Sequence, residues 1–187
     1  YGDGGFVGSK NKLLIEKVKR IRLYGMDKIN KKNKFFNKYY SNEHGINSRI
    51  DEIQCSILNL KLKKVKSFII KRRKIANIYK KNLYKTSLVL PPENKNCEHV
   101  YHLFVVYHKK RNLIFKKLKK YNIYPNINYE YPIHLMKAYK SKISKSRGLS
   151  NSEKFAKGIF SLPIYPNLEP KNISRFIGIL KKILKTI

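Results

Sequence analysis

The chain reads Gly45-Ile46-Asn47-Ser48-Arg49-Ile50-Asp51-Glu52-Ile53-Gln54 where its longest helical pattern begins. Ser48 is predicted to cap that helix, because a serine oxygen can bind the free amides of a first turn, and Asp51 and Glu52 suit the positive end of the helix dipole. Apolar residues then recur at helical spacing: Ile50, Ile53, Ile57, Leu60, Phe68, Ile75, Ile78 and Tyr79. No helix breaker follows before Leu83, so we predict one helix of about 50 Å, at 1.5 Å per residue, that links two domains.

The segment before this helix predicts three shorter features. The glycine-rich run over residues 2–8 is typical of a turn that enters a short strand. Leu14, Val18 and Ile21 have helical spacing, and Gly25 suits the left-handed conformation that often ends a helix. Residues 26–46 are polar and lack a clear period, which indicates a loop.

The segment after Pro91-Pro92 alternates helices with few strands, which indicates an α/β or α+β fold. In chain order we predict a strand over residues 99–107, a short helix over 113–121, an irregular loop or edge strand over 122–135, a helix over 150–160 capped by Ser150 and Glu153, an extended connector over 161–166, and a last helix opened by Pro170. The apolar stripe of that last helix consists of Ile173, Phe176, Ile177, Leu180, Ile183 and Leu184.

Composition bounds the class of protein. The chain has 187 residues, 42% of them hydrophobic, which is enough for an ordinary packed domain. It contains no run of about 18 apolar residues, so no membrane-spanning helix is expected. The 2 cysteines are too few for a disulfide scaffold and fit a reducing cytoplasm. Tyr1 is not followed by the pattern of a signal peptide, and we expect the chain to start within a longer protein.

The formal net charge of +32 would ordinarily suggest a nucleic-acid partner. However, the chain has 35 Lys and only 8 Arg, whereas phosphate and guanine recognition favours the bidentate fork of Arg. The lysines are spread from Lys10 to Lys185, and Lys, Ile and Asn, all abundant here, share AT-rich codons. We therefore interpret the charge as a solvated surface, and keep a basic nucleic-acid-binding module as an alternative function.

Residue patterns alone predict no complete active site. His99 and His102 would face opposite sides of a strand, so they are not expected to share a metal ion. Cys55 and Cys97 have no partner at metal-binding spacing, and the glycine-rich opening lacks both phosphate-binding signatures. Asp51 and Glu52 are better explained as residues of a helix start than as a catalytic pair.

The sequence does contain a resemblance. Residues 45–54 closely resemble the segment G-Y-N-S-R-L-D-E-L-Q of the sugar-nucleotide aminotransferases, the DegT/DnrJ/StrS family. Four more blocks follow the family's order: Gly2-Asp3-Gly4-Gly5, His99-Val100-Tyr101-His102-Leu103, Tyr131-Pro132-Ile133-His134-Leu135 and Ser161-Leu162-Pro163-Ile164-Tyr165-Pro166. The resemblance implies the type I fold of pyridoxal-phosphate (PLP) transferases, here its C-terminal part only. Residues 1–68 would be the end of the large α/β cofactor domain, including the start of the long linking helix, and residues 69–187 the small C-terminal α+β domain.

The family's activity is PLP-dependent transamination of a nucleotide-linked keto-sugar, with glutamate as the expected amino donor. The resemblance thus implies a cytoplasmic homodimer that serves polysaccharide or amino-sugar biosynthesis. In the family, the lysine that forms a Schiff base with the cofactor lies a few residues before the G-D-G-G turn, which places it upstream of Tyr1. We therefore expect no catalytic residue within this chain and no turnover by it alone. A non-catalytic remnant is a further alternative.

Some family roles can be carried over by position. Asn47 matches the asparagine that binds the PLP phosphate of the partner subunit, and a position just before a helix N-terminus suits an anion; the alternative is an Asn that merely caps the helix. Arg49 is expected to meet a phosphate or to pair with Glu52. Residues 128–134 resemble the substrate loop H-Y-P-V-P-L-H, so Asn128, Tyr129 and His134 are the expected substrate contacts. The loop departs from the family at Asn128 and at Glu130, which would bring negative charge near a pyrophosphate.

Overall fold

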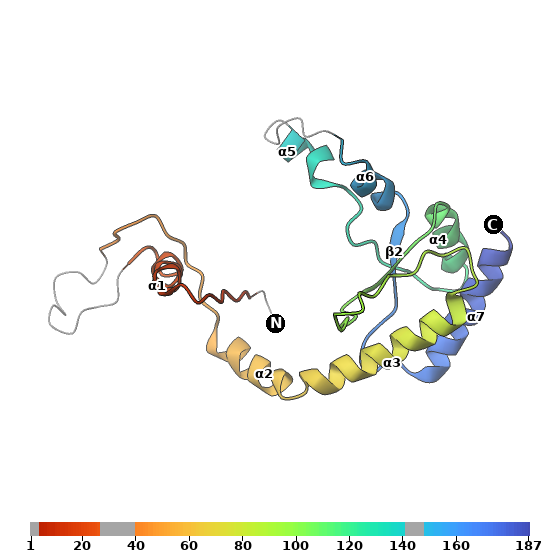
Figure 1. Cartoon of the computed structure of the whole chain (residues 1–187), viewed down its shortest axis with the longest axis horizontal. Helices are drawn as coiled ribbons and strands as arrows, with labels where there is room; N and C mark the ends of the chain where they lie inside the picture. Colours follow the sequence, from red (N-terminus) through yellow and green to blue (C-terminus); the bar gives the residue numbers. More distant parts are fainter. Residues whose placement is uncertain (1–3, 27–39, 141–147) are drawn as a thin grey trace. The chain divides into compact units, whose positions relative to one another are not determined.

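The structure is a computed structural model that describes residues 4–26, 40–140 and 148–187 (Figure 1). The chain divides into two compact units, Tyr1–Lys64 and Val65–Ile187, called unit 1 and unit 2 below. Each unit is described by itself. The α/β composition predicted from the sequence is confirmed, since helices dominate both units and a small sheet lies in unit 2.

Unit 1 contains α1 (Lys12–Ile21) and α2 (Glu52–Leu62). The Oδ1 atom of Asn11 caps α1 by accepting a 3.2 Å hydrogen bond from the amide of Leu14. The helix predicted from Leu14, Val18 and Ile21 is thereby confirmed. The prediction of a short strand after the glycine-rich run is wrong, because residues 4–9, which the structure describes, form neither helix nor strand. Residues 1–3 of that run and residues 27–39 of the predicted loop lie outside the described residues.

The start of α2 differs from the prediction. Asp51 is the N-cap, and its amide donates a 3.3 Å hydrogen bond to Oε1 of Gln54. Ser48 does not cap the helix, because its backbone is already paired elsewhere. Its amide donates to the carbonyl of Arg22 at 2.9 Å, and its own carbonyl accepts from Nε of Arg22 at 3.1 Å. An extended pairing thus holds residue 48 and delays the helix to Glu52.

The prediction of a single long helix is also wrong. α2 ends at Leu62, a turn occupies Lys63 and Lys64, and α3 (Val65–Leu83) follows. The amide of Lys64 donates to the carbonyl of Lys61 at 2.9 Å, three residues back, which closes α2 with a tight turn. Like charges three and four residues apart destabilise a helix, and lysines stand at 61, 63, 64 and 66. The apolar stripe continued through this point, but it did not predict the interruption.

Unit 2 is built around a two-stranded antiparallel sheet of β1 (Phe104–Tyr107) and β2 (Ile159–Leu162), in which Phe104 lies opposite Leu162. Its helices after α3 are α4 (Arg111–Lys119), the 3-10 turn η1 (Ile133–Leu135), α5 (Lys137–Lys140), α6 (Ser150–Ala156) and α7 (Pro170–Lys185). Three predictions are confirmed here: the helix near 113–121, the loop before η1, and Pro170 in the first turn of α7.

Two predicted boundaries in unit 2 are wrong. The strand over 99–107 is limited to its last four residues, and Tyr101 has φ +48, which no strand allows. The helix over 150–160 ends at Ala156, so Phe160 belongs to β2; Ser150 is its first helical residue rather than its cap. An alternation of buried and exposed positions over so few residues does not separate a short strand from a helix end.

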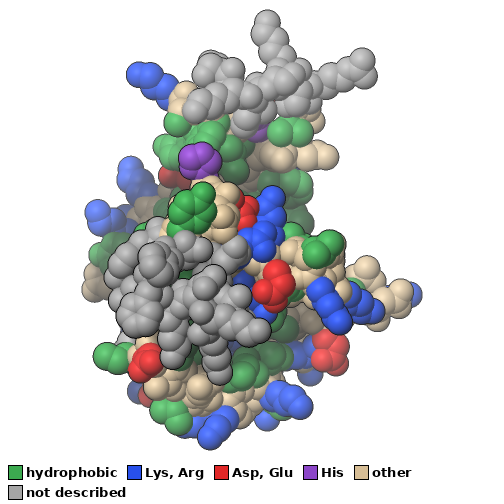
Figure 2. All heavy atoms as spheres, turned by 90° about the vertical axis from the view of Figure 1, so that its left-hand side faces the viewer, with side chains coloured by type: hydrophobic (Ala, Val, Ile, Leu, Met, Phe, Trp, Pro, Cys, Tyr) green, Lys and Arg blue, Asp and Glu red, His purple; other side chains and the backbone are tan. Residues whose placement is uncertain are grey.

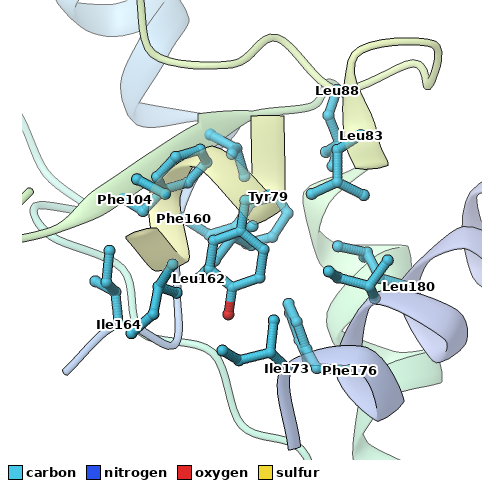
Figure 3. Close-up of a cluster of buried hydrophobic side chains, with 14 of the residues drawn as sticks. Tyr79, Leu83, Leu88, Phe104, Phe160, Leu162, Ile164, Ile173, Phe176 and Leu180 are labelled. Atoms are coloured by element: carbon cyan, nitrogen blue, oxygen red, sulfur yellow. The ribbon is translucent and has the colours of Figure 1, made fainter. Parts of the chain in front are cut away.

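A closed hydrophobic core fills unit 2 between α3, α7 and the sheet (Figure 3). Tyr79 of α3 lies at its centre, with its ring 5.2 Å from that of Phe104 and 6.1 Å from that of Phe176. Its hydroxyl donates a 2.6 Å hydrogen bond to the carbonyl of Pro163, and burial raises the pKa of this phenol. The apolar stripe predicted for α7 is confirmed, because all six of its residues are buried.

Arg72 of α3 ties two distant segments together. Its Nη1 atom donates hydrogen bonds to the carbonyls of Tyr101 at 3.1 Å and His102 at 2.9 Å. The same atom lies 2.9 Å from the carbonyl of Ile164. The carbonyls of residues 101–102 are therefore used by a side chain, which explains why β1 begins only at Phe104.

Within the described ranges, no helix is both long enough and apolar enough to cross a membrane. Figure 2 shows one face of the molecule, on which Lys and Arg side chains are interspersed with hydrophobic and acidic ones. The arginines also serve internal contacts, as Arg20, Arg72 and Arg111 bind carboxylates or carbonyls of the chain itself.

Candidate functional site

The predicted site residues fall into two groups, one in each unit. Asn47 and Arg49 belong to unit 1, whereas Asn128, Tyr129 and His134 belong to unit 2. Each group has its own local scaffold. The two groups are therefore described separately.

In unit 1, residues 45–49 run antiparallel to residues 21–25. The amide of Ile46 donates to the carbonyl of Ile21 at 2.8 Å, and Asn47 forms a bridge with Leu23. Gly25 has φ +72, and a Cβ there would overlap the carbonyl oxygen of Glu43. A Cβ on Gly45 would likewise overlap the backbone amide of Gly25. Two glycines thus allow the close approach that fixes the backbone of Asn47.

A pocket of about 540 Å³ lies beside this pairing, lined by Glu16, Lys19, Arg20, Arg22, Leu23, Met26 and Arg49. Lys19 pairs with Glu16 at 2.7 Å, and Arg20 pairs with Glu43 at 2.9 Å. Among the described residues, neither Arg22 nor Arg49 forms an ion pair. The wall is therefore net positive, and its volume suits a small anionic ligand.

Asn47 was predicted either to bind an anion at a helix N-terminus or to cap that helix, and both predictions misplace the start of the helix. α2 begins at Glu52 and is capped by Asp51, so Asn47 stands four residues before the cap. It neither caps the helix nor lies at the helix N-terminus. An anion contact of Asn47 would therefore have no help from the amides at the start of α2. The alternative pairing of Arg49 with Glu52 is not found among the described ion pairs.

In unit 2, the loop over residues 126–131 is fastened to β2. The amide of Ser161 donates to the carbonyl of Asn126 at 2.8 Å, and the Ser161 hydroxyl donates to Oδ1 of Asn128 at 3.1 Å. Asn128 is thus oriented by the strand. Tyr129, which follows it, is 83% exposed. The loop holds its backbone against the sheet and presents an aromatic side chain to solvent.

Two carboxylates form contacts at or beside this loop. Oε1 of Glu130 lies 3.6 Å from Nη2 of Arg111, whose side chain is 5% exposed. Part of the negative charge expected near a pyrophosphate is therefore balanced within the protein. Nε2 of His134 lies 3.1 Å from Oε1 of Glu153 on α6. His134 is held in place by that contact.

His99 and His102 do not stand on a strand, so the reason we gave for rejecting them as a metal pair is wrong. Nδ1 of His99 accepts a 2.8 Å hydrogen bond from the amide of Tyr101, and the two rings stack with centroids 4.2 Å apart. In the described part of the chain, no cluster of three His, Cys, Asp or Glu side chains could hold a metal ion.

A model of the DegT/DnrJ/EryC1/StrS aminotransferase family matches residues 1–181. The chain belongs to this family. The resemblance drawn from residues 45–54 and the four further blocks is thereby confirmed.

Curated relatives include sugar transaminases. A dTDP-3-amino-3,4,6-trideoxy-alpha-D-glucose transaminase of Micromonospora megalomicea subsp. nigra is 33% identical over 98% of this chain and 48% of its own length. A dTDP-3-amino-3,6-dideoxy-alpha-D-galactopyranose transaminase of Aneurinibacillus thermoaerophilus is 33% identical over 93% of this chain and 45% of its own length. The chain therefore spans about half the length of the curated relatives it matches.

Solved structures show the same relation. S. venezuelae DesV, in complex with a ketimine intermediate, aligns with a TM-score of 0.82 at 28% identity, over 95% of this chain and 46% of that one. Helicobacter pylori PseC aligns with a TM-score of 0.82 at 23% identity, over 96% of this chain and 48% of its own, which supports the fold. The predicted fold class, part of a type I PLP aminotransferase, is confirmed.

For this family member, sequence reasoning missed the residues that support the two groups. Arg22 and Lys19 contribute to the pocket, and Arg111, Ser161 and Glu153 contact Glu130, Asn128 and His134. One signal was available for the arginines. In a chain with 35 Lys and 8 Arg, an Arg is the rarer cation, and its planar guanidinium can bind several acceptors at once in a way that an ammonium does not.

Proposed function

We propose that this chain is part of a PLP-dependent aminotransferase that acts on a nucleotide-linked keto-sugar. The carrying observation is the identity of 33% to a dTDP-sugar transaminase over 98% of the chain. A positively lined pocket beside the pairing of residues 21–25 with residues 45–49 supports it, because both the cofactor and a sugar nucleotide carry phosphate. We further propose glutamate as the amino donor and a homodimer as the active form, from the resemblance alone.

The residues of unit 1 fit the phosphate end of PLP. Asn47 offers an amide donor, and Arg22 and Arg49, which line the pocket beside the pairing of residues 21–25 with residues 45–49, offer guanidinium groups. The cofactor itself would supply the electron sink of the reaction. Within the described residues we assign no lysine to the Schiff base and no carboxylate to the pyridine nitrogen. In the family these precede the G-D-G-G turn, so we propose that the 187-residue chain alone has no turnover.

The residues of unit 2 fit the sugar-nucleotide side. Tyr129 can stack on or hydrogen-bond a sugar or base, while Asn128 and His134 offer polar groups held in place by Ser161 and Glu153. In the homodimer we propose, Asn47 serves the cofactor of the other subunit. We assign residues 1–68 to the end of the large domain and 69–187 to the small domain, although the two units meet at Lys64.

Intact mass from the source cell tests this proposal. After borohydride reduction, we expect a polypeptide of about twice 22.2 kDa that carries a cofactor adduct. A 22.2 kDa chain without adduct would favour a non-catalytic remnant. In the complete enzyme, Asn47→Ala should weaken PLP retention about tenfold or more, as expected for a lost hydrogen bond to a charged group. Unchanged retention would remove Asn47 from the cofactor site.

The charge of +32 keeps one rival open, a nucleic-acid-binding module. Binding driven by phosphate contacts weakens steeply as salt rises, with a slope set by the number of contacts. A titration of duplex DNA and of single-stranded RNA at two salt concentrations distinguishes the two functions. We expect weak binding without sequence preference; tight binding with a steep slope would favour the rival.

A further inference from the structure

Arg111 is a buried cation at the junction of three segments of unit 2. It is the first residue of α4, and its side chain is 5% exposed. Its Nη1 atom donates to the carbonyl of Ala156 at 2.7 Å and to that of Ile159 at 3.3 Å. These two carbonyls lie at the end of α6 and the start of β2. Arg111 therefore locks the turn that leads into the strand.

The other side of the guanidinium faces the substrate loop. Nη2 of Arg111 lies 3.6 Å from Oε1 of Glu130, while its Nε donates to Oδ1 of Asn112 at 3.2 Å. Within the described residues, Glu130 is the one carboxylate that forms an ion pair with Arg111. A buried guanidinium needs a counter-charge, and a half-exposed carboxylate on a loop supplies it here.

The loop is thus fastened to the sheet at two points. Ser161 of β2 holds Asn128, and Arg111 holds Glu130, with Tyr129 between them. Figure 1 shows the segment between α4 and η1 passing beside β2, in agreement with the bridge between Asn126 and Ser161. An exposed Tyr side chain gains affinity for a ligand when its backbone is already ordered, because less entropy is lost on binding.

We propose that Arg111 is a positioning residue for sugar-nucleotide binding: through Glu130 it fixes the loop that presents Asn128 and Tyr129. The proposal rests on the proposed function for the identity of the ligand. It also explains how a carboxylate is tolerated where the family has a proline. The guanidinium both orients Glu130 and offsets its repulsion of a pyrophosphate.

The first test needs no ligand. Chymotrypsin cuts after aromatic residues, so we expect it to cleave after the exposed Tyr129 at a rate that follows the fraction of the loop that is open. In the full protein, Glu130→Gln should speed this cleavage about fivefold, because it removes one fastening. Cleavage after Tyr84, 64% exposed and remote in sequence, should not change. Glu98→Gln is the matched control: Glu98 pairs with Arg73 at 3.4 Å in another loop, so this variant should leave cleavage after Tyr129 unchanged. Equal rates after Tyr129 in wild type and Glu130→Gln would overturn the proposal.

The second test measures affinity for dTDP-glucose, with thymidine as the uncharged control. Arg111→Lys keeps the charge but loses the fork, and should weaken dTDP-glucose binding about fivefold. Arg111→Met should weaken it about tenfold or more, and adding Glu130→Gln to it should cost little further, because the two residues act as one unit. Additive losses, or losses that merely follow a lower melting temperature, would overturn the role of Arg111.

The two failures are distinguishable. If the wild-type protein binds neither dTDP-glucose nor UDP-glucose while the Tyr129 cleavage still responds to Glu130→Gln, the proposed substrate is wrong. In that case Arg111 is a structural fastening without a role in recognition. If the wild type binds the probe and neither variant changes cleavage or affinity, the proposed function stands and the inference about Arg111 is wrong.

Discussion

α1 and α7 carry equally clear apolar stripes in sequence, yet only one of them buries its stripe. α7 buries six side chains in the core of unit 2. α1 buries none, and its Leu13 and Leu14 are 82% and 45% exposed. In the part of the chain that the structure describes, every buried hydrophobic side chain belongs to unit 2. A stripe therefore specifies which face of a helix is apolar, but not whether this chain supplies the surface that covers it.

The largest expected effect comes from replacing a leucine by alanine once in each unit, at a buried position of unit 2 and at an exposed position of unit 1. Leu180→Ala in α7, where the side chain is 0% exposed, should lower the free energy of unfolding by about 3–4 kcal/mol through lost burial and a cavity. Leu60→Ala in α2, 65% exposed, should change it by less than about 0.5 kcal/mol. Urea denaturation followed by tyrosine fluorescence measures both. Similar losses at the two positions would show that α2 is covered in solution.

Unit 1 is held by backbone contacts instead of a core, and Gly25→Ala should expose that difference. The substitution forces a side chain into φ +72 and against the carbonyl of Glu43. The amides of Asn42 and Ile46, which bond to Gly25 and Ile21, should exchange with solvent about tenfold faster or more. Gly178→Ala is the control, because a Cβ there meets nothing within 4 Å in α7. That variant should instead gain about 0.5–1 kcal/mol from helix propensity. Unchanged exchange in Gly25→Ala would refute the role of the glycine.

Removal of one hydroxyl tests how much a buried hydrogen bond contributes to the stability of unit 2. Tyr79→Phe keeps the ring but removes the donor to the Pro163 carbonyl, so we expect a loss of about 1 kcal/mol. Urea midpoints of the wild type and the variant provide the measurement. Tyr84→Phe, at an exposed tyrosine, is the matched control and should be neutral. A neutral Tyr79→Phe would mean that the hydrogen bond contributes nothing net.

The smallest effect is a pH dependence confined to unit 2. Nδ1 of His108 accepts the amide of Lys110 at 3.0 Å, and burial, followed by Lys110 and Lys109, lowers the pKa of this imidazole. Above a pH of about 6.5, His108 is neutral in both the folded and the unfolded chain. Below it, the unfolded chain takes up a proton that the folded state resists, so the free energy of unfolding falls as pH falls. His108→Gln should remove that part of the slope between about pH 7 and 5 in urea melts. An unchanged slope would assign it to other groups.

The sequence predicted the family and the buried face of α7, because both depend on patterns that persist over many residues. Residues 45–54 identified the family even though their local geometry was misjudged. Ser48 looks like a helix cap in isolation, but Arg22, 26 residues away, binds both its amide and its carbonyl. The ends of elements depend on such distant partners, which a local pattern does not contain.

The candidate site divides in the same way. Asn47, Arg49, Asn128, Tyr129 and His134 were named from the resemblance, and their roles stay predictions. Their supports were not foreseen, since Ser161 and Arg111 reach Asn128 and Glu130 across the fold. Glu130 was expected to bring uncompensated charge, because its partner lies 19 residues earlier on another element. Long-range pairing of this kind is a property of the folded chain, not of any short segment.

Arg72 has a consequence for the order in which unit 2 folds. One nitrogen of its guanidinium binds carbonyls that lie 29, 30 and 92 residues away in the chain. Closing such long loops costs chain entropy before the contacts compensate it, and three hydrogen bonds from one side chain need the segments already in place. We therefore expect the contacts of Arg72 to form after the transition state of folding. Arg72→Met would then leave the refolding rate nearly unchanged and raise the unfolding rate. The lifetime of the folded state, rather than the speed of reaching it, would then depend on this one side chain.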